Sequence, residues 1–168
     1  MIKGPIVLAL FMLIGGNLRA QEVSEYMHQI VGQWSGALTY LDYSDDTSQT
    51  TLNCKMKASW NNNKGTISIG FEEPNGKVIY DKAKIKLFGD QERVKFDGVV
   101  YTIDSFNSDP SGDQWTLILI AEGQDNYKPA MIRQSIVLEV DNLSLVKEIK
   151  YDGSAAYFTR NSYSFNKL

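Results

Sequence analysis

Hydrophobic and polar residues alternate with a period of two along most of the chain beyond residue 30, which is typical of β-strands that bury one face. The stretches 51–60, 81–87 and 115–121 show the alternation most clearly. In the first two stretches the polar face carries lysines, whereas residues 115–121 are apolar on both faces. We therefore expect the strand at 115–121 to be covered on both sides near one of its ends.

Turn-forming residues separate these stretches at regular intervals. The pairs Asn75-Gly76, Asp97-Gly98 and Asp152-Gly153 tolerate positive φ angles and suit tight hairpins. None of the prolines interrupts an alternating stretch. The pattern predicts ten strands near residues 32–43, 50–60, 65–72, 78–88, 92–96, 99–106, 114–122, 131–141, 143–151 and 154–163.

Helical periodicity is confined to Ser24–Val31, which predicts one short helical turn before the first strand. Hairpin-linked strands form an antiparallel up-and-down meander, which closes most simply into a barrel because closure removes the exposed edges. A membrane barrel needs apolar side chains on its outer face, whereas this pattern places lysines there. The sequence thus predicts an all-β, soluble, closed barrel of about ten strands. The outward lysines are Lys55, Lys57, Lys82, Lys84 and Lys86.

The first twenty residues have the layout of a secretory signal peptide. Lys3 supplies a positive charge, Ile6–Ile14 is an unbroken apolar run, and Ala20 is a suitable last residue before cleavage. The apolar run is too short to cross a bilayer, which takes roughly 20 apolar residues. We expect a signal peptide at 1–20 and one domain at 21–168, exported to the periplasm or secreted, without a membrane span.

Removing Lys3 and Arg19 with the signal segment leaves 15 basic and 20 acidic residues, a net charge of −5. An acidic domain lacks the electrostatic footprint of a nucleic-acid-binding protein and the polybasic patch that anionic lipid attracts. Cys54 is the only cysteine, so no internal disulfide forms. We interpret Cys54 as a small buried hydrophobe, with a reactive thiol as the alternative. Asn142 opens a glycosylation sequon, a tripeptide that often arises by chance.

The first predicted strand opens with Gly32-Gln33-Trp34, and Arg160 lies late in the last strand. An inward Trp closes one end of a small barrel, and the Gly before it lets the chain bend into the strand. Together with the meander, this pattern resembles lipocalins and related calycin barrels, which open on G-x-W. In those families a late Arg packs over the Trp. The resemblance therefore implies a structural signature of Gly32, Trp34 and Arg160, with Arg160 stacked on Trp34.

Two features depart from that resemblance. Most lipocalins have eight strands and a disulfide, whereas about ten strands and no disulfide are expected here; that strand number is closer to fatty-acid-binding proteins and nitrobindin-like barrels. Haem-binding barrels of the latter kind use a proximal His, but the only His of this chain, His28, precedes the first strand. The resemblance thus implies a fold without a particular ligand, and no cofactor is expected.

If Trp34 points inward, the alternation also places Tyr40 and Asp42 on the inner face. A carboxylate is costly to bury unless it is paired or hydrated, so we expect Asp42 at the mouth or in a polar pocket, beside the Tyr40 hydroxyl. A solvated strand end is the alternative. Arg133 lies in the polar segment Glu122–Gln134, which suits either a ligand lid or an exposed hairpin. Arg133 itself suits a clamp for a carboxylate or phosphate, or an ion pair with an acidic neighbour such as Asp42.

No catalytic or metal-binding constellation is readable, because the chain has one His, one Cys and no carboxylates at ligand spacing. We interpret it as a non-enzymatic barrel that binds a small apolar or amphipathic ligand in its lumen. One alternative is a filled barrel that presents loops to a protein partner; the weakest is a barrel enzyme that uses Tyr, Asp or Glu. The ligand-binding barrel and the filled barrel differ in whether large inward side chains fill the lumen. Those side chains are Trp34, Tyr40, Met56, Trp60 and Trp115.

Overall fold

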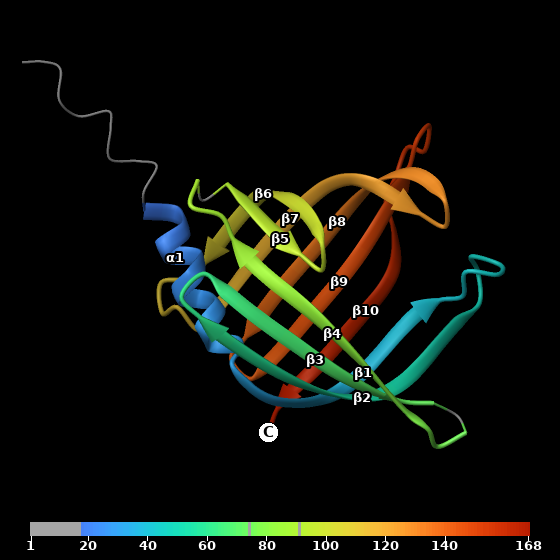
Figure 1. The fold of residues 1–168 in the computed structure, drawn as a ribbon, viewed down its shortest axis with the longest axis horizontal. Helices are drawn as coiled ribbons and strands as arrows, with labels where there is room; N and C mark the ends of the chain where they lie inside the picture. Colours follow the sequence, from blue (N-terminus) through green and yellow to red (C-terminus); the bar gives the residue numbers. More distant parts are fainter. Residues whose placement is uncertain (1–17, 74, 91) are drawn as a thin grey trace, which may run out of the picture.

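The computed structural model describes residues 18–168 except 74 and 91. Ten strands form one closed sheet in which each strand pairs antiparallel with the next and β1 pairs with β10 (Figure 1). A helix, α1 (Leu18–Met27), and a 3₁₀ turn, η1 (His28–Ile30), precede the strands. The strands are β1 (Gly32–Leu41), β2 (Gln49–Asn61), β3 (Lys64–Glu72), β4 (Val78–Leu87), β5 (Arg93–Phe96), β6 (Val99–Ser108), β7 (Gln114–Asp125), β8 (Lys128–Glu139), β9 (Asn142–Tyr151) and β10 (Phe158–Lys167).

This topology confirms the predicted all-β, closed antiparallel barrel of ten strands with a short N-terminal helical segment. The largest shift of a strand boundary is in β10, which begins at Phe158 rather than near residue 154 and runs on to Lys167. Of the predicted signal segment, 1–20, residues 1–17 lie outside the described residues. In the described part, no helix has the length and apolarity needed to cross a membrane.

The polar segment Glu122–Gln134 is a tight hairpin, the second of its two expected forms. β7 continues to Asp125, and β8 resumes at Lys128. The two residues between them, Asn126 and Tyr127, have positive φ angles of 48° and 62°. Two such residues in succession match the right-handed twist of the flanking strands, so both strands extend farther than the polar composition predicted.

The helical segment closes one end of the barrel (Figure 1). Its apolar residues Val23, Met27 and Ile30 are buried in the core that also contains three tryptophans. Each indole N–H donates a hydrogen bond to this segment, which satisfies the polar end of a buried ring. The bonds run from Trp34 to the Ile30 carbonyl (2.9 Å), from Trp60 to the Ser24 hydroxyl (3.2 Å) and from Trp115 to the Gln29 side-chain oxygen (2.9 Å).

β1 and β10 approach so closely that only glycine fits at position 36. A Cβ atom on Gly36 would lie 1.9 Å from the Ser164 carbonyl oxygen and 2.8 Å from the Phe165 Cα. Because both of those atoms belong to the backbone, no side-chain movement relieves the overlap. Gly36 is therefore required for barrel closure at this seam.

The wall of the barrel is incompletely paired at β4 and β5. Residue pairing between β4 and β5 covers Ile85–Leu87, because β5 is only four residues long. Within the described residues, the half of β4 from Val78 to Ala83 is therefore paired with β3 alone. Figure 1 shows the ends of β3–β4 and β7–β8 diverging on the side away from α1.

Candidate functional site

The lumen contains a cavity of about 310 Å³. Its apolar wall comes from inward positions of β3, β5, β8 and β9, including Ile67, Phe96, Ile132 and Leu145. At about 30 Å³ per water molecule, the space corresponds to roughly ten waters, which suits a small ligand. The polar lining residues that concern the chemistry are Asp81, Asp97, Gln134, Lys147, Asn161 and Tyr163.

A second cavity of about 250 Å³ lies towards the mouth. Its lining includes Leu38, Tyr40 and Phe71 from inward positions of β1 and β3, and the side chain of Arg160. Asn161 lines both cavities, so the two spaces adjoin around this residue. The lumen is therefore open over its mouth half, while the three tryptophans fill the half next to α1.

A buried ion-pair network, here called the mouth network, borders the second cavity. Its centre is Arg160, whose side chain is 1% exposed. One terminal nitrogen, Nη1, donates to Asp46 at 2.6 Å; the other, Nη2, donates to Asp125 at 2.6 Å and to the Tyr151 hydroxyl at 2.9 Å. Among the described residues, the Arg160 Nε has no hydrogen-bond partner. The network ties the β1–β2 loop, β7, β9 and β10 together around the opening.

Aromatic rings and a second cation complete the mouth network. The Arg160 guanidinium lies 4.5 Å from the ring centre of Tyr43 and 5.0 Å from that of Phe158. Asp125 also receives hydrogen bonds from the Tyr151 hydroxyl at 3.0 Å and from the Lys147 ammonium at 3.4 Å. Each buried charge thus has an opposite charge in contact, the condition under which burial of ions is tolerated.

The pKa values of the network agree with this pairing. Burial acts to lower the pKa of Arg160, but hydrogen bonds to the Asp46 and Asp125 carboxylates outweigh it and raise that pKa. Burial, then the hydrogen bond to Asp125, raises the pKa of the Tyr151 hydroxyl. At neutral pH the arginine is therefore charged and the tyrosine is a neutral donor.

Two carboxylates line the 310 Å³ cavity without a cation beside them. Among the described residues, neither Asp81 nor Asp97 has a basic group within 4.0 Å. Burial and then the charge of Asp81 raise the pKa of Tyr163 to about 12. Lys147, the cation that lines the same cavity, is already in contact with Asp125. The lumen outside the mouth network therefore has an excess of negative charge.

The predicted site residues Tyr40 and Asp42 are separated by the end of β1. Tyr40 lines the mouth cavity as expected. Asp42 follows the last residue of the strand, Leu41, so the inward alternation stops before it. Its carboxylate accepts the backbone N–H of Ser44 at 2.7 Å, and this hydrogen bond lowers the pKa of Asp42. Asp42 stabilises the β1–β2 turn, which corresponds to the second of its two expected positions, a strand end outside the lumen.

Arg133 is on the outer face of β8 and not in the lumen. Its guanidinium makes two hydrogen bonds to Glu148 on β9, at 2.6 and 2.8 Å, and lies 4.2 Å from the ring centre of Tyr157. The Glu148 contact raises the pKa of Arg133. The ion-pair interpretation therefore describes this residue, with Glu148 as partner in place of Asp42.

The expected stacking of Arg160 on Trp34 is also wrong. The β1–β10 register pairs Trp34 with Lys167 and Tyr40 with Asn161, which places Arg160 at the far end of the strands from Trp34. The Lys167 ammonium lies 5.5 Å from the Trp34 ring centre. Because β10 starts and ends later than predicted, Lys167 occupies the position over the tryptophan and Arg160 occupies the mouth.

Sequence reasoning did not identify the other charged members of the mouth network, which are Lys147, Asp46 and Asp125. Lys147 had a usable signal, because it lies at an inward position of β9 between the buried residues Leu145 and Ile149. A cation in such a position needs an acidic partner. Asp46 and Asp125 had no comparable signal, because each lies next to a turn where acidic residues are common.

His28 and Cys54 have structural surroundings. His28 is exposed on η1, with its ring 6.5 Å from that of Trp60 at the closed end. Cys54 is buried, and its burial raises the pKa of the thiol to about 11, so it stays protonated at neutral pH. In the part of the chain that the structure describes, no group of three His, Cys, Asp or Glu residues has the geometry of a metal site.

Comparison with known proteins shows likeness in fold. No family model matches the sequence, and no curated protein matches it. The crystal structure of Rv2717c from M. tuberculosis aligns with a TM-score of 0.58 and 11% identity, covering 89% of this chain and 97% of that one. Lobster apocrustacyanin A1 aligns with a TM-score of 0.46 and 14% identity, covering 93% and 70%.

Proposed function

We propose that this lipocalin-like barrel is a non-catalytic binding protein that holds a small amphipathic ligand in its lumen. The observation that supports this proposal is the open cavity of about 310 Å³ with an apolar wall and a polar edge. Binding pockets typically combine apolar walls with a few polar groups that orient the ligand. A volume at the low end of the usual range, roughly 300–1,000 Å³, favours a small molecule over a large cofactor.

The charge of the lumen favours a ligand with a cationic end. Asp81 and Asp97 are exposed residues at the lining of the cavity without a cation beside them, while Lys147 is engaged by Asp125. A ligand ammonium would receive charge-assisted hydrogen bonds from such carboxylates, whereas a ligand carboxylate would be repelled. We therefore favour an amphipathic amine whose apolar body lies against Ile67 and Ile132.

The alternative function is a filled barrel that presents loops to a protein partner. It requires that large inward side chains occupy the lumen. Trp34, Trp60 and Trp115 gather at the α1 end instead, where each bonds to the helical segment. The space that remains towards the mouth supports ligand binding over this alternative.

Calorimetric titration with octylamine, octanol and octanoate tests the proposal, because the three probes share an alkyl chain and differ in charge. We expect octylamine to bind about tenfold more tightly than octanoate, with octanol between them. Asp81→Asn combined with Asp97→Asn should remove the preference for the amine while octanol binds as before. Asp141→Asn, an exposed carboxylate in the β8–β9 turn, is the control.

The outcomes separate the two parts of the proposal. Absence of binding by all three probes would overturn binding in the lumen and favour the filled-barrel alternative. Equal binding of the three probes, or an amine preference that survives the double variant, would contradict the role of the two carboxylates.

Export forms part of the proposed function, since the signal-like segment 1–20 precedes the barrel. N-terminal sequencing of protein from the periplasm or medium should begin near Gln21. Retention of Met1 in the exported or cell-associated protein would contradict cleavage at this position.

A further inference from the structure

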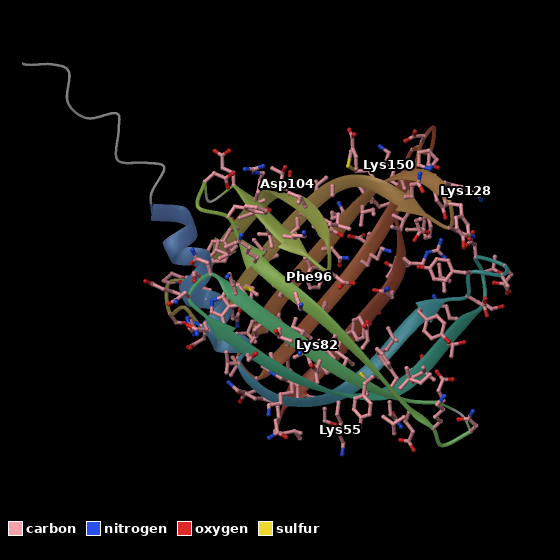
Figure 2. All side chains as sticks on the ribbon, viewed as in Figure 1. Lys55, Lys82, Phe96, Asp104, Lys128 and Lys150 are labelled. Atoms are coloured by element: carbon pink, nitrogen blue, oxygen red, sulfur yellow. The ribbon has the colours of Figure 1, made fainter. Side chains whose placement is uncertain are left out.

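One outer face of this acidic protein is strongly basic. On β2–β5 the outward positions carry eight of the chain's 17 Lys and Arg residues, all exposed, against one acidic residue, Glu72. Figure 2 shows Lys55 and Lys82 on this side of the barrel, with Lys128 and Lys150 away from them on β8 and β9. The residues of the basic face are Lys55, Lys57, Lys64, Lys82, Lys84, Lys86, Arg93 and Lys95.

The strand register places like charges directly opposite one another. Lys64 on β3 pairs with Lys86 on β4, and Lys86 pairs in turn with Lys95 on β5. Like charges at directly opposed positions destabilise a sheet. Among the described residues, Arg93 is the one member of the basic face with a carboxylate partner, Asp90. Pairing of like charges opposes folding, and an anionic ligand would relieve the repulsion.

A groove of about 890 Å³ runs along the outer face of β1–β4 and β10 beside these lysines. Lys55 and Lys57 line the groove, and the register places Lys82 next to its lining residue Ser68, on the other side from Lys57. The rest of the lining combines apolar residues and one carboxylate, Glu72, with neutral amide and hydroxyl side chains, which both donate and accept hydrogen bonds. The neutral polar residues of the lining are Gln33, Ser35, Asn53, Ser68 and Asn166.

Tyr80 supplies an exposed ring at the same groove. Its side chain is 79% exposed, although it lies on a regular strand. A Cβ atom on Gly70 would lie 2.9 Å from a ring carbon of Tyr80, so the ring rests against the backbone of β3. The glycine thus lets an aromatic ring lie across the sheet, opposite Lys55 in the next strand. An apolar ring with a polar hydroxyl suits a ligand that is itself partly apolar and partly polar.

We propose that this groove is a second binding site, for an acidic polysaccharide. The lysines match its anionic groups, the amides and hydroxyls match its sugar hydroxyls, and Tyr80 offers a surface for a sugar ring. A membrane surface is less well matched because the site is a groove, and single-stranded nucleic acid is less well matched because such sites stack successive bases on several aromatics. The site is separate from the lumen, and its occupancy does not depend on lumen binding.

The experiment measures binding of a polygalacturonate oligomer to the full barrel by calorimetry at low salt, with a neutral dextran oligomer, a single-stranded DNA oligomer and anionic lipid vesicles as parallel probes. We expect polygalacturonate to bind and dextran not to bind. Lys57→Gln combined with Lys82→Gln should weaken binding about tenfold. Tyr80→Ala should weaken it several-fold without changing the charge.

Lys128→Gln combined with Lys150→Gln is the matched control, because it removes the same charge from β8 and β9, away from Lys55 and Lys82 (Figure 2). The control should bind polygalacturonate within about twofold of the unmodified protein. An equal loss in the control would show an effect of net charge and overturn the site. A Tyr80→Ala variant that binds as before, or tighter binding of DNA or vesicles than of polygalacturonate, would overturn the polysaccharide assignment. Circular dichroism of each variant verifies that the barrel is intact.

Discussion

The two ends of the barrel are stabilised by different kinds of contact. At the α1 end, Trp34, Trp60 and Trp115 are buried against an amphipathic segment. At the mouth, Arg160 and Asp125 form a buried ion pair. Apolar burial stabilises by roughly 25 cal/mol per Å² and depends little on which apolar residues are in contact. A buried ion pair contributes little net stability against an apolar replacement, but it fixes which groups meet.

This difference indicates a division of roles between the ends. The tryptophan end supplies stability and closes the lumen. The mouth network holds the β1–β2 loop against β7, β9 and β10, and so keeps the opening in a defined shape beside a cavity. Polar contacts, not an apolar plug, hold the rim at this end.

The largest expected effect is at the closed end. Trp34→Ala should lower the free energy of unfolding by about 4 kcal/mol, because it removes a fully buried ring and leaves a cavity. Urea denaturation measures the change. Tyr127→Ala, which removes a 95% exposed ring, is the control and should change stability by less than about 0.5 kcal/mol. Similar losses in the two variants would mean that Trp34 is not part of the core.

A somewhat smaller loss is expected at the mouth. Asp125→Asn should cost about 3 kcal/mol, because it leaves the buried Arg160 guanidinium without one of its two carboxylates. The exposed Asp152→Asn provides the comparison in the same urea experiment. If Asp125→Asn were no more costly than Asp152→Asn, the mouth network would not be closed in solution.

High pH should lower the free energy of unfolding through Tyr163, which lines the lumen. The pKa of Tyr163 is raised to about 12 in the folded state, from about 10 in the unfolded chain. Between these values the unfolded state releases the proton more readily, so the stabilisation present below about pH 10 is lost as pH rises towards 12. Unfolding free energies at about pH 9 and about pH 11.5 should therefore differ more for the native sequence than for Tyr163→Phe. Equal pH dependence in both proteins would contradict the burial of the Tyr163 hydroxyl.

The smallest expected effect is the coupling between the two ends. A double-mutant cycle of Trp34→Phe and Arg160→Met should be additive within about 0.5 kcal/mol, because the register places the two residues far apart on their strands. A coupling above about 1 kcal/mol would show that the closed end and the mouth respond to each other.

The sequence predicted the elements of this barrel well because each depends on local chemistry. Alternation defines a strand wherever one face is buried, and turn residues mark its ends. Strand limits were wrong at two places: β7 and β8 extend as far as the hairpin at Asn126-Tyr127, and β10 starts late. The second error moved Arg160 from the tryptophan to the mouth, because a shift along a strand changes every cross-strand neighbour.

The distribution of charge on the surface also depends on cross-strand neighbours that the sequence alone does not reveal. The net charge of −5 excluded a basic site, although the outward lysines of β2 and β4 were recognised as a solvent face. What the sequence did not contain is that β2, β3, β4 and β5 are neighbours in a register that aligns those lysines in rows. Composition averages over the surface, whereas a binding face depends on local density of charge.

By itself, the sequence determined the strand pattern, the closure of a ten-stranded barrel and the inward position of Trp34, because these follow from hydrophobic burial and from pairing of sheet edges. Only the tertiary structure decided the partners of Arg160, which come from Asp46 and Asp125, 114 and 35 residues away in the sequence. Contacts at such separations depend on strand register and twist, and those are properties of the whole closed sheet, not of any one stretch of the chain.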